Sequence, residues 1–385
     1  MMNRRNFVHR MGLGAAVLGA GSIGLSARAA EPAISARHIT IGSSMPTTGP
    51  LASAGVDHTA SILAAFAEIN RAGGVHGREL RFMTKDDGYS ALRTVANVKD
   101  MIDQDSAYAF MSIIGTPNNA GVLPLTEKAG IPVLGPITGA SSLRQAEYRH
   151  TFHIRPSYTT EVQRMVLQLA QAGISAIAVV YLDNPFGKEV LADAQTALAQ
   201  AKLGAAVKSF PLAVDGRNAA DVAQKVRDSG VGAVLLGATG TGTTDFVLEL
   251  RKMGIGLPVV GLSVTFTDIN RLGHHILGLA AASFLPSAKS KKYAVVRRYL
   301  AAMEAGGYSN MTGLGLESYV NAHLMAESIR RAGRDITRDK LRNALAATRN
   351  FEMGELSFGF SEASPFVAGS SVKMGVFDAE GVLRV

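Results

Sequence analysis

Short runs of β-branched and apolar residues alternate with amphipathic segments along this chain, and the whole alternation occurs twice. The first series runs from a strand predicted at residues 39–43 to one at 131–134, and the second from 176–181 to 259–261. Strands that alternate with helices fold most compactly as a mostly parallel sheet covered by helices on both faces. The sequence therefore predicts an α/β protein with two lobes, each built on its own sheet.

The other helices and strands are predicted in the same way, from the spacing of apolar residues along the chain. Residues 46–55, rich in Pro, Gly and Thr, are expected to form a loop after the first strand, and a helix is expected from 57 to 72. The C-terminal part is predicted to be helix-rich and to end in β-structure. Further helices are expected at 91–102, 120–128, 187–201, 219–228, 244–252, 294–304, 316–332 and 339–347, with β-structure at 355–360 and 372–377.

The first 29 residues have the three parts of an export signal. Arg4 and Arg5 precede an uncharged, mostly small and apolar run at 11–25, and the small-x-small sequence Ala27-Arg28-Ala29 follows it. The arginine pair followed by Phe7 favours the twin-arginine route, and the general secretory route stays open as the alternative. The apolar run is shorter than the roughly 20 residues that span a bilayer. We therefore expect a periplasmic protein without stable membrane insertion.

Charge and cysteine usage exclude several function classes. The formal net charge is +8, but removing the four arginines of residues 1–29 from the 39 basic residues leaves 35 against 31 acidic ones. The basic cluster at 289–292 is typical of a solvated loop, so nucleic-acid binding is not expected. The chain has no cysteine, which excludes thiol catalysis and cysteine metal sites.

Signals for an enzyme are weak throughout. His150 and His153, and the pair His274-His275, have no partner residues in a metal-ligand pattern. The segment 237–242, Gly-Ala-Thr-Gly-Thr-Gly, follows a predicted strand but lacks the acidic residue about 20 positions later that would hold a ribose. We expect no catalytic residue, no metal and no cofactor.

Ligands of open α/β sheets bind beyond the carboxyl ends of the strands. The loops at these positions are rich in Gly, Ser, Thr, Asn and Pro, and several precede helix N-termini, whose partial positive charge suits a carboxylate. These loops are predicted at 44–55, 115–119, 135–142, 183–187, 237–244 and 262–268.

An ordered set of motifs resembles the periplasmic ligand-binding proteins of the branched-chain amino acid (Leu/Ile/Val-binding) type, which deliver solutes to ABC importers. The motifs are Thr-Gly-Pro-Leu-Ala at 48–52, Glu-Ile-Asn-Arg-Ala-Gly-Gly-Val-His-Gly-Arg at 68–78, Lys-Asp-Asp-Gly at 85–88, Ala-Gly-Ile-Pro-Val-Leu at 129–134 and Val-Val-Tyr-Leu-Asp-Asn-Pro-Phe-Gly at 179–187. The resemblance implies three hinge crossings, an N-terminal lobe of residues 36–153 and 281–352, and a C-terminal lobe of 154–280 and 353–385.

The same resemblance implies a set of ligand-binding positions. Thr116 falls where the family holds a ligand carboxylate, and Thr138 and Gly139 fall in a second binding loop. Phe186 and Thr239 are the corresponding positions of the second lobe. From the residues alone, Thr116 could instead cap the following helix, Thr138 and Gly139 could shape a turn, and Phe186 could belong to the core.

Ser263, which we include among the expected ligand-binding residues, marks a departure from the family pattern. Amino-acid binders place an acidic residue in this loop to neutralise the ligand ammonium, but residues 261–267 contain none. An unpaired buried ammonium is costly. Either another acid, such as Glu161 or Asp183, takes that role, or the ligand is an organic acid or amide without an α-ammonium.

The sequence leaves the roles of two pairs of residues undecided. One pair lies near the predicted first crossing between the lobes, and the other lies at the end of the second predicted strand. Arg155 and Tyr158 could be structural hinge residues or could line the cleft, and we include Tyr158 among the binding residues. Asp86 and Asp87 form either a solvated strand end or a hydrogen-bonding pair near the hinge, not a pair of catalytic acids.

The expected function is that of an exported, monomeric solute-binding protein. It captures a small, carboxylate-bearing ligand (an amino acid, an aromatic acid or an amide) between its lobes and delivers it to the permease of an ABC importer. The alternative is a periplasmic ligand sensor of the same fold that signals to a membrane receptor.

Overall fold

The structure is a computed structural model that describes residues 32–201, 207–369 and 371–385. The predicted export signal lies outside these residues. No helix within the described residues is long and apolar enough to cross a membrane.

The first large sheet has the strand order β13-β5-β4-β3-β1-β2, and all of its pairings are parallel. Strand β1, which lies between β3 and β2, is buried along its entire length, with Ile39 and Ile41 fully inaccessible. Buried strands of this kind are apolar on both faces because helices cover both. The strands are β1 (His38–Met45), β2 (Glu79–Asp86), β3 (Ala109–Met111), β4 (Val133–Leu134), β5 (Thr151–His153) and β13 (Phe366–Val367).

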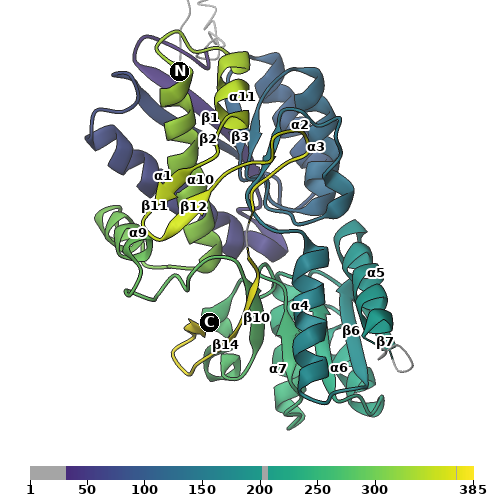
Figure 1. Ribbon diagram of the computed structural model, residues 1–385. Coiled ribbons are helices and arrows are strands. Elements are labelled where there is room, and N and C mark those ends of the chain that lie inside the picture. The colour runs from purple at the N-terminus through teal and green to yellow at the C-terminus, as the bar shows by residue number, and fades with distance from the viewer. Residues whose placement is uncertain (1–31, 202–206, 370) are drawn as a thin grey trace, which may run out of the picture. The chain divides into compact units, whose positions relative to one another are not determined.

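Helices from both ends of the chain cover this sheet (Figure 1). α1 packs against α10 and α9, and α2 packs against α3. The helices are α1 (Ala52–Arg71), α2 (Ala91–Asp103), α3 (Thr116–Lys128), α9 (Ala294–Ala305), α10 (Gly313–Ala332) and α11 (Arg338–Ala346), with short 3-10 turns η1 (Gly49–Leu51) and η2 (Ser141–Leu143).

The prediction of a loop over residues 46–55 is wrong for residues 49–55. These residues form η1 and the first turn of α1. Pro50 lies in the first turn of η1, where its missing N–H costs nothing. Gly55 faces the backbone of Pro46 so closely that a Cβ would lie 2.3 Å from the Pro46 carbonyl oxygen. The glycine therefore serves a close approach inside a helix and does not mark a turn.

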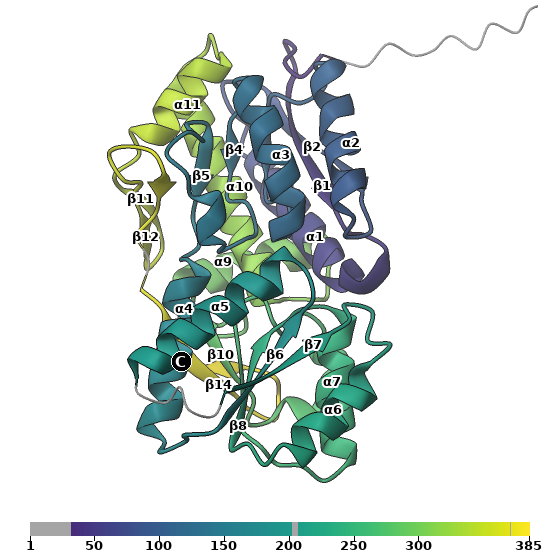
Figure 2. The same ribbon diagram turned by 90° about the vertical axis from the view of Figure 1, so that its right-hand side faces the viewer.

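The second large sheet has the order β15-β14-β10-β9-β8-β6-β7. Its core is parallel, and β14 and β15 add antiparallel at the β10 edge. Figure 2 shows α4 and α5 together and α6 and α7 together beside these strands, in agreement with their packing. The elements are α4 (Tyr158–Gln171), β6 (Ile177–Leu182), α5 (Pro185–Gln200), β7 (Val207–Leu212), α6 (Ala219–Asp228), β8 (Ala233–Gly237), α7 (Thr241–Lys252), β9 (Val259–Gly261), α8 (Ile269–Leu272), η4 (Gly273–Ile276), β10 (Ala280–Ser283), β14 (Lys373–Phe377) and β15 (Leu383–Arg384).

The prediction of two mostly parallel sheets flanked by helices is confirmed. Within the described residues the chain passes between the sheets three times: after β5, after β10, and between β13 and β14. A separate hairpin of β11 (Phe351–Met353) and β12 (Leu356–Phe358) precedes the third crossing. The lobe bounds given above stay a prediction. Sheet membership favours one change, because β13 joins the first sheet although it lies within the segment 353–385.

Candidate functional site

A cavity between the two lobes collects side chains from the carboxyl ends of strands in both sheets. We call it the cleft cavity; its empty space is about 360 Å³. From the first lobe it is lined by Leu51, Ala54, His58, Tyr89, Ile114 and Thr116. From the second lobe it is lined by Tyr158, Phe186, Thr239, Val264 and Thr267. Its position is the one in which open parallel sheets bind ligands.

Thr116 lies at this cavity as the first residue of α3. The preceding Gly115 has φ 102°, a backbone conformation that favours glycine and turns the chain from β3 into the helix. The Thr116 Oγ1 atom lies 2.8 Å from the Thr138 Oγ1 atom, and both side chains are buried. The start of α3 therefore brings a hydroxyl pair and a helix N-terminus, with its partial positive charge, to the cavity wall.

Thr138 and Gly139 support the wall from behind. Thr138 Oγ1 accepts a hydrogen bond from Ala140 N at 3.2 Å. A Cβ on Gly139 would lie 2.6 Å from the ring of Tyr158, so only glycine leaves room for that ring. The backbone N–H of Tyr158 also donates to Gly139 O at 2.7 Å. These two residues hold Thr116 and Tyr158 in place and are not among the residues that line the cavity.

Aromatic rings form much of the cavity surface. The rings of Tyr158 and Phe186 meet edge to face, with centroids 5.1 Å apart. Tyr158 begins α4, whose N-cap residue Ser157 accepts from Thr160 N. Burial raises the pKa of the Tyr158 hydroxyl to about 12, so it stays protonated at neutral pH. Such a surface suits a flat apolar body, since edge-to-face contacts add to the burial of apolar area.

Thr239 reaches the cavity from the loop after β8. Its hydroxyl donates to the carbonyl oxygen of Val264 at 2.6 Å, which fixes one cavity-lining loop to another. The next residue, Gly240, has φ 79°, and a Cβ there would lie 2.7 Å from the Leu51 side chain of the first lobe. The glycine therefore allows the two lobes to approach each other closely.

Ser263 is turned away from the cleft cavity. Its hydroxyl donates to Glu161 Oε1 at 2.8 Å and accepts from Arg155 Nη1 at 2.8 Å. Its backbone N–H donates to Glu161 Oε2 at 2.8 Å. Arg155 also forms a buried ion pair with Glu317.

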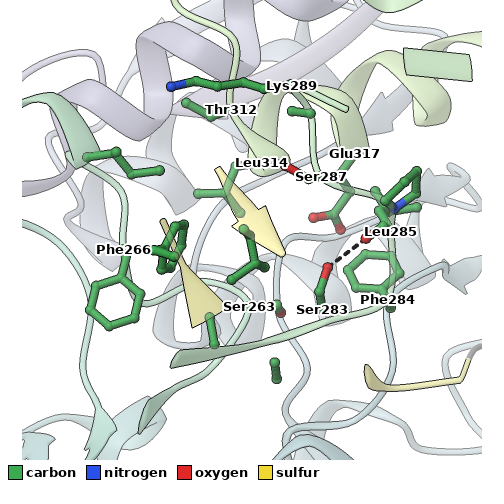
Figure 3. A pocket seen from close by; sticks show the side chains of 18 of the residues that line it. Ser263, Phe266, Ser283, Phe284, Leu285, Ser287, Lys289, Thr312, Leu314 and Glu317 are labelled. Atoms are coloured by element: carbon green, nitrogen blue, oxygen red, sulfur yellow. Dashed lines mark hydrogen bonds between the residues drawn. The ribbon is translucent and has the colours of Figure 1, made fainter. Parts of the chain in front are cut away.

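These groups border a second cavity of about 750 Å³ at the crossings, which we call the hinge cavity. Figure 3 shows Ser263, Phe284 and Glu317 around it, with Ser283 donating to the carbonyl oxygen of Leu285. Its charged side chains are Arg155 and Glu317, which pair with each other, and Lys289, whose ammonium donates to the Glu380 carbonyl oxygen at 3.1 Å. The cleft cavity, which lies beyond the carboxyl ends of the strands of both sheets, is the candidate ligand site.

The two acids considered as partners for a ligand ammonium are used elsewhere. Both carboxylate oxygens of Glu161 accept from Ser263. Burial raises the pKa of the Glu161 carboxyl, while the nearby Arg155 charge opposes that shift. Asp183 is largely exposed and pairs with Lys188 at 2.9 Å. Neither acid is among the residues that line the cleft cavity.

The two lobes contact each other around the cleft cavity. Thr241 Oγ1 donates to Pro50 O at 3.0 Å, and Ser53 Oγ donates to Thr267 O at 3.2 Å. Farther out, Glu189 on α5 accepts from the hydroxyl of Ser142 at 2.6 Å. These contacts describe lobes that are closed over the cavity.

A scan of known families gives the decisive match. The model of the periplasmic binding protein family matches residues 38–364. The chain belongs to that family. The resemblance inferred from the sequence motifs is thereby confirmed.

Two relatives illustrate the similarity of this periplasmic binding protein. Leu/Ile/Val-binding protein homolog 7 of Brucella suis biovar 1 is 22% identical over 201 residues, which are 49% of this chain and 50% of the relative. The chain thus spans about half the length of the curated relatives it matches. A substrate-binding periplasmic protein from Ralstonia solanacearum has a TM-score of 0.80 and 28% identity over 90% of this chain and 99% of that one.

A third similarity concerns the fold alone. A solute-binding protein of an ABC transporter from R. palustris, solved in complex with 4-hydroxybenzoate, is 18% identical with a TM-score of 0.79. That alignment covers 90% of this chain and 95% of the solved one.

His58 and Tyr89 are among the lining residues that sequence reasoning did not single out. Tyr89 has φ 63° and its ring packs over Gly115, where a Cβ would lie 2.6 Å from it. The turn that presents it is built by the neighbouring acids: Asp86 accepts from Gly88 N, and Asp87 accepts from Tyr89 N. Asp86 and Asp87 therefore shape this turn by hydrogen bonding. A tyrosine after Asp-Asp-Gly at a strand end was the available signal.

His58 lies within α1 and is buried. Its Nδ1 atom is 2.5 Å from Ser318 Oγ on α10. Burial, and after it the nearby Arg155 charge, lower the pKa of its imidazole to about 3. The ring is therefore neutral at pH 7.

Histidines elsewhere give no metal site. Among the described residues no group of three His, Asp or Glu side chains could hold a metal ion. His150 contacts Glu127 at 2.9 Å, and the rings of His274 and His275 contact each other on the surface.

Proposed function

We propose that this chain is a solute-binding protein that captures a small, mostly apolar carboxylate in the cleft cavity and delivers it to an ABC importer. The supporting observation is the chemistry of the cavity wall. Among the described residues that line it there is no Asp, Glu, Lys or Arg, while Tyr89, Tyr158 and Phe186 supply aromatic surface. Polar recognition falls to hydroxyls, one neutral imidazole and the N-terminus of α3.

A carboxylate fits this wall better than an α-amino acid does. The Thr116 hydroxyl and the first turn of α3 can stabilise an anion without a cationic side chain. An ammonium in the same cavity would be desolvated without a counter-ion, because Glu161 is already engaged by Ser263. The protein thus favours aromatic or branched aliphatic acids over the amino acids of the same skeleton.

A thermal-shift screen with matched ligand pairs tests this proposal. The pairs are leucine with 4-methylpentanoate and phenylalanine with 3-phenylpropanoate, followed by benzoates and the corresponding amides. A ligand at 100 times its Kd should stabilise the folded protein by about 2.7 kcal/mol. We expect the acids to raise the midpoint and the amino acids to leave it unchanged. Stabilisation by leucine but not by 4-methylpentanoate would refute the carboxylate assignment.

We also propose that residues 1–29 direct export and that the twin-arginine route is used. Fusion of these residues to a fluorescent protein that matures before export should give periplasmic fluorescence. Replacement of Arg4 and Arg5 by lysine should abolish it. Export that survives this double replacement would assign the general secretory route instead.

Delivery to an importer is tested in the organism that carries the gene. Deletion of the gene should abolish uptake of the acid identified in the screen, and a plasmid copy should restore it. Unchanged uptake with a loss of the transcriptional response to the acid would favour the sensor role.

A further inference from the structure

His58 carries a buried polar atom for which the described residues offer no partner. The side chain is completely buried, and its Nδ1 atom is engaged with Ser318. The Nε2 atom, on the other side of the ring, has no hydrogen-bond partner. Nearly all buried polar side-chain atoms in proteins have one. His58 also lines the cleft cavity, so the side chain that carries the unpaired atom is part of the wall that a ligand contacts.

The surroundings of the ring limit what can pair with it. Ser318 and the ring nitrogen Nδ1 share one proton position, so Nε2 is either a donor or an acceptor according to the tautomer. The charge of Arg155 opposes any added positive charge nearby. Asp57, the neighbouring acid on α1, is engaged by Asn310 at 2.6 Å and is not among the cavity-lining residues. A cationic ligand group would therefore have no counter-ion there.

We propose that His58 Nε2 is a specificity-determining contact to a hydroxyl group of the ligand. The ligand class is then a hydroxylated carboxylic acid, whose carboxylate lies at Thr116 and whose hydroxyl pairs with His58. A hydroxyl can donate or accept, so it satisfies Nε2 in either tautomer, whereas a ketone or ether can only accept. This inference rests on the proposed function, because it assigns the second polar contact of the same cavity.

The expected selectivity follows from the cost of an unpaired buried group. A site built to hydrogen-bond a hydroxyl rejects the analogue that lacks it, because the analogue leaves the protein atom unpaired. For one neutral hydrogen bond the loss is about 10- to 100-fold in affinity. The parent acid should still bind, since its ring and carboxylate contacts are unchanged.

Isothermal titration of the purified protein with matched acids tests the assignment. The probes are benzoate with 2-, 3- and 4-hydroxybenzoate, and phenylacetate with mandelate. We expect at least one hydroxy acid to bind about 10- to 100-fold more tightly than its parent. In the variant His58→Leu this preference should fall to within threefold of unity.

Two further variants make the result decisive. His58→Gln keeps a polar side chain at this position and should retain part of the preference, and it replaces His58→Leu if that variant does not fold. His274→Leu, an exposed histidine away from the cavity, is the matched control and should behave as wild type.

The outcomes separate this inference from the proposed function. Equal binding of hydroxy and parent acids, or a preference that persists in His58→Leu, overturns the role of His58 and leaves carboxylate binding intact. Failure of every acid to bind overturns both.

Discussion

Arg155 on the first crossing and Glu317 on α10 form an ion pair in which the side chains are only 1% and 2% exposed. The guanidinium also donates to Ser263 of the second lobe and lies over the ring of Phe284, which follows β10 on the second crossing. One arginine thus connects two crossings with a helix of the first lobe and a loop of the second. The buried guanidinium of Arg155 is therefore in contact with residues of both lobes at the hinge.

Loss of one member of this pair should be strongly destabilising. Glu317→Gln leaves the guanidinium buried without its main counter-charge, which typically costs about 3–5 kcal/mol of unfolding free energy. Urea denaturation followed by circular dichroism measures the change. The double variant Arg155→Met, Glu317→Leu removes both charges and should recover most of the loss. If the double variant is as unstable as the sum of its single changes, the pair interaction is not the cause.

The buried carboxyl of Asp57 should make the free energy of unfolding depend on pH. Burial raises the pKa of its carboxyl from 3.8 to about 7. The folded protein therefore holds the proton more tightly than the unfolded chain, so this group's contribution is fully present below pH 3.8 and is lost as the pH rises through 7. The variant Asp57→Asn has no ionisable group at this position, so it does not lose this stabilising contribution as the pH rises.

The measurement compares wild type and Asp57→Asn by urea denaturation at pH 5 and pH 8. Relative to wild type, the variant should gain about 2–3 kcal/mol in unfolding free energy between pH 5 and pH 8. The buried His58 and His153, whose pKa values lie near 3, affect both proteins equally and cancel in the difference. A difference that is the same at both pH values would show that Asp57 is ionised in the folded state.

Thr116→Val should weaken binding of the carboxylate ligand by about 1–3 kcal/mol, because the methyl group cannot donate to the anion. Titration calorimetry with the acid from the screen gives the affinity. Thr196→Val, on the exposed side of α5, is the matched control for the same change of side chain. Equal affinity of the Thr116 variant and the control would remove Thr116 from the site.

Glu189 should influence affinity without touching the ligand. It accepts from the backbone N–H of Ser141 at 2.5 Å and from the Ser142 hydroxyl, so it stabilises the closed lobes. Glu189→Gln weakens charge-assisted bonds that exist only in this closed arrangement. Affinity should fall about 3- to 10-fold through the lobe equilibrium.

Small-angle scattering checks the mechanism of that effect. The ligand-free Glu189 variant should have a larger radius of gyration than wild type, and saturating ligand should restore the wild-type value. Glu249→Gln, which alters a surface pair with Lys252 on α7, should change neither quantity.

The sequence predicted the elements whose signals are local. The strand expected at 39–43 is the centre of β1, and its β-branched, apolar residues suit burial on both faces. β5 and β10 are among the strands that were missed, and for the opposite reason. β10 is Ala-Ala-Ala-Ser and has no strand signal of its own; it forms because β9 and β14 pair with it on either side. β5 is only three residues long and is placed by β4 and β13.

Some features of the site depend on contacts between residues that lie far apart in the sequence, and the spacing of residues along the chain does not reveal such contacts. The resemblance implied Thr116, Phe186 and Thr239, and the structure brings them together with Tyr158 at the cleft cavity. Ser263 occupies such a loop but faces Glu161, 102 residues earlier in the chain. His58 was missed because only the packing of α1 on α10 brings it to Ser318 and the cavity.

The last strands to be synthesised have a consequence for the timing of folding. β13 completes one edge of the first sheet, and β14 and β15 complete one edge of the second. Neither sheet can reach its final width until the ribosome has made nearly the whole chain. The hydrogen bonding of both sheets is therefore complete only after residues 366–384 have been made. Under the export route that we propose for residues 1–29, the route is selected before either sheet is complete.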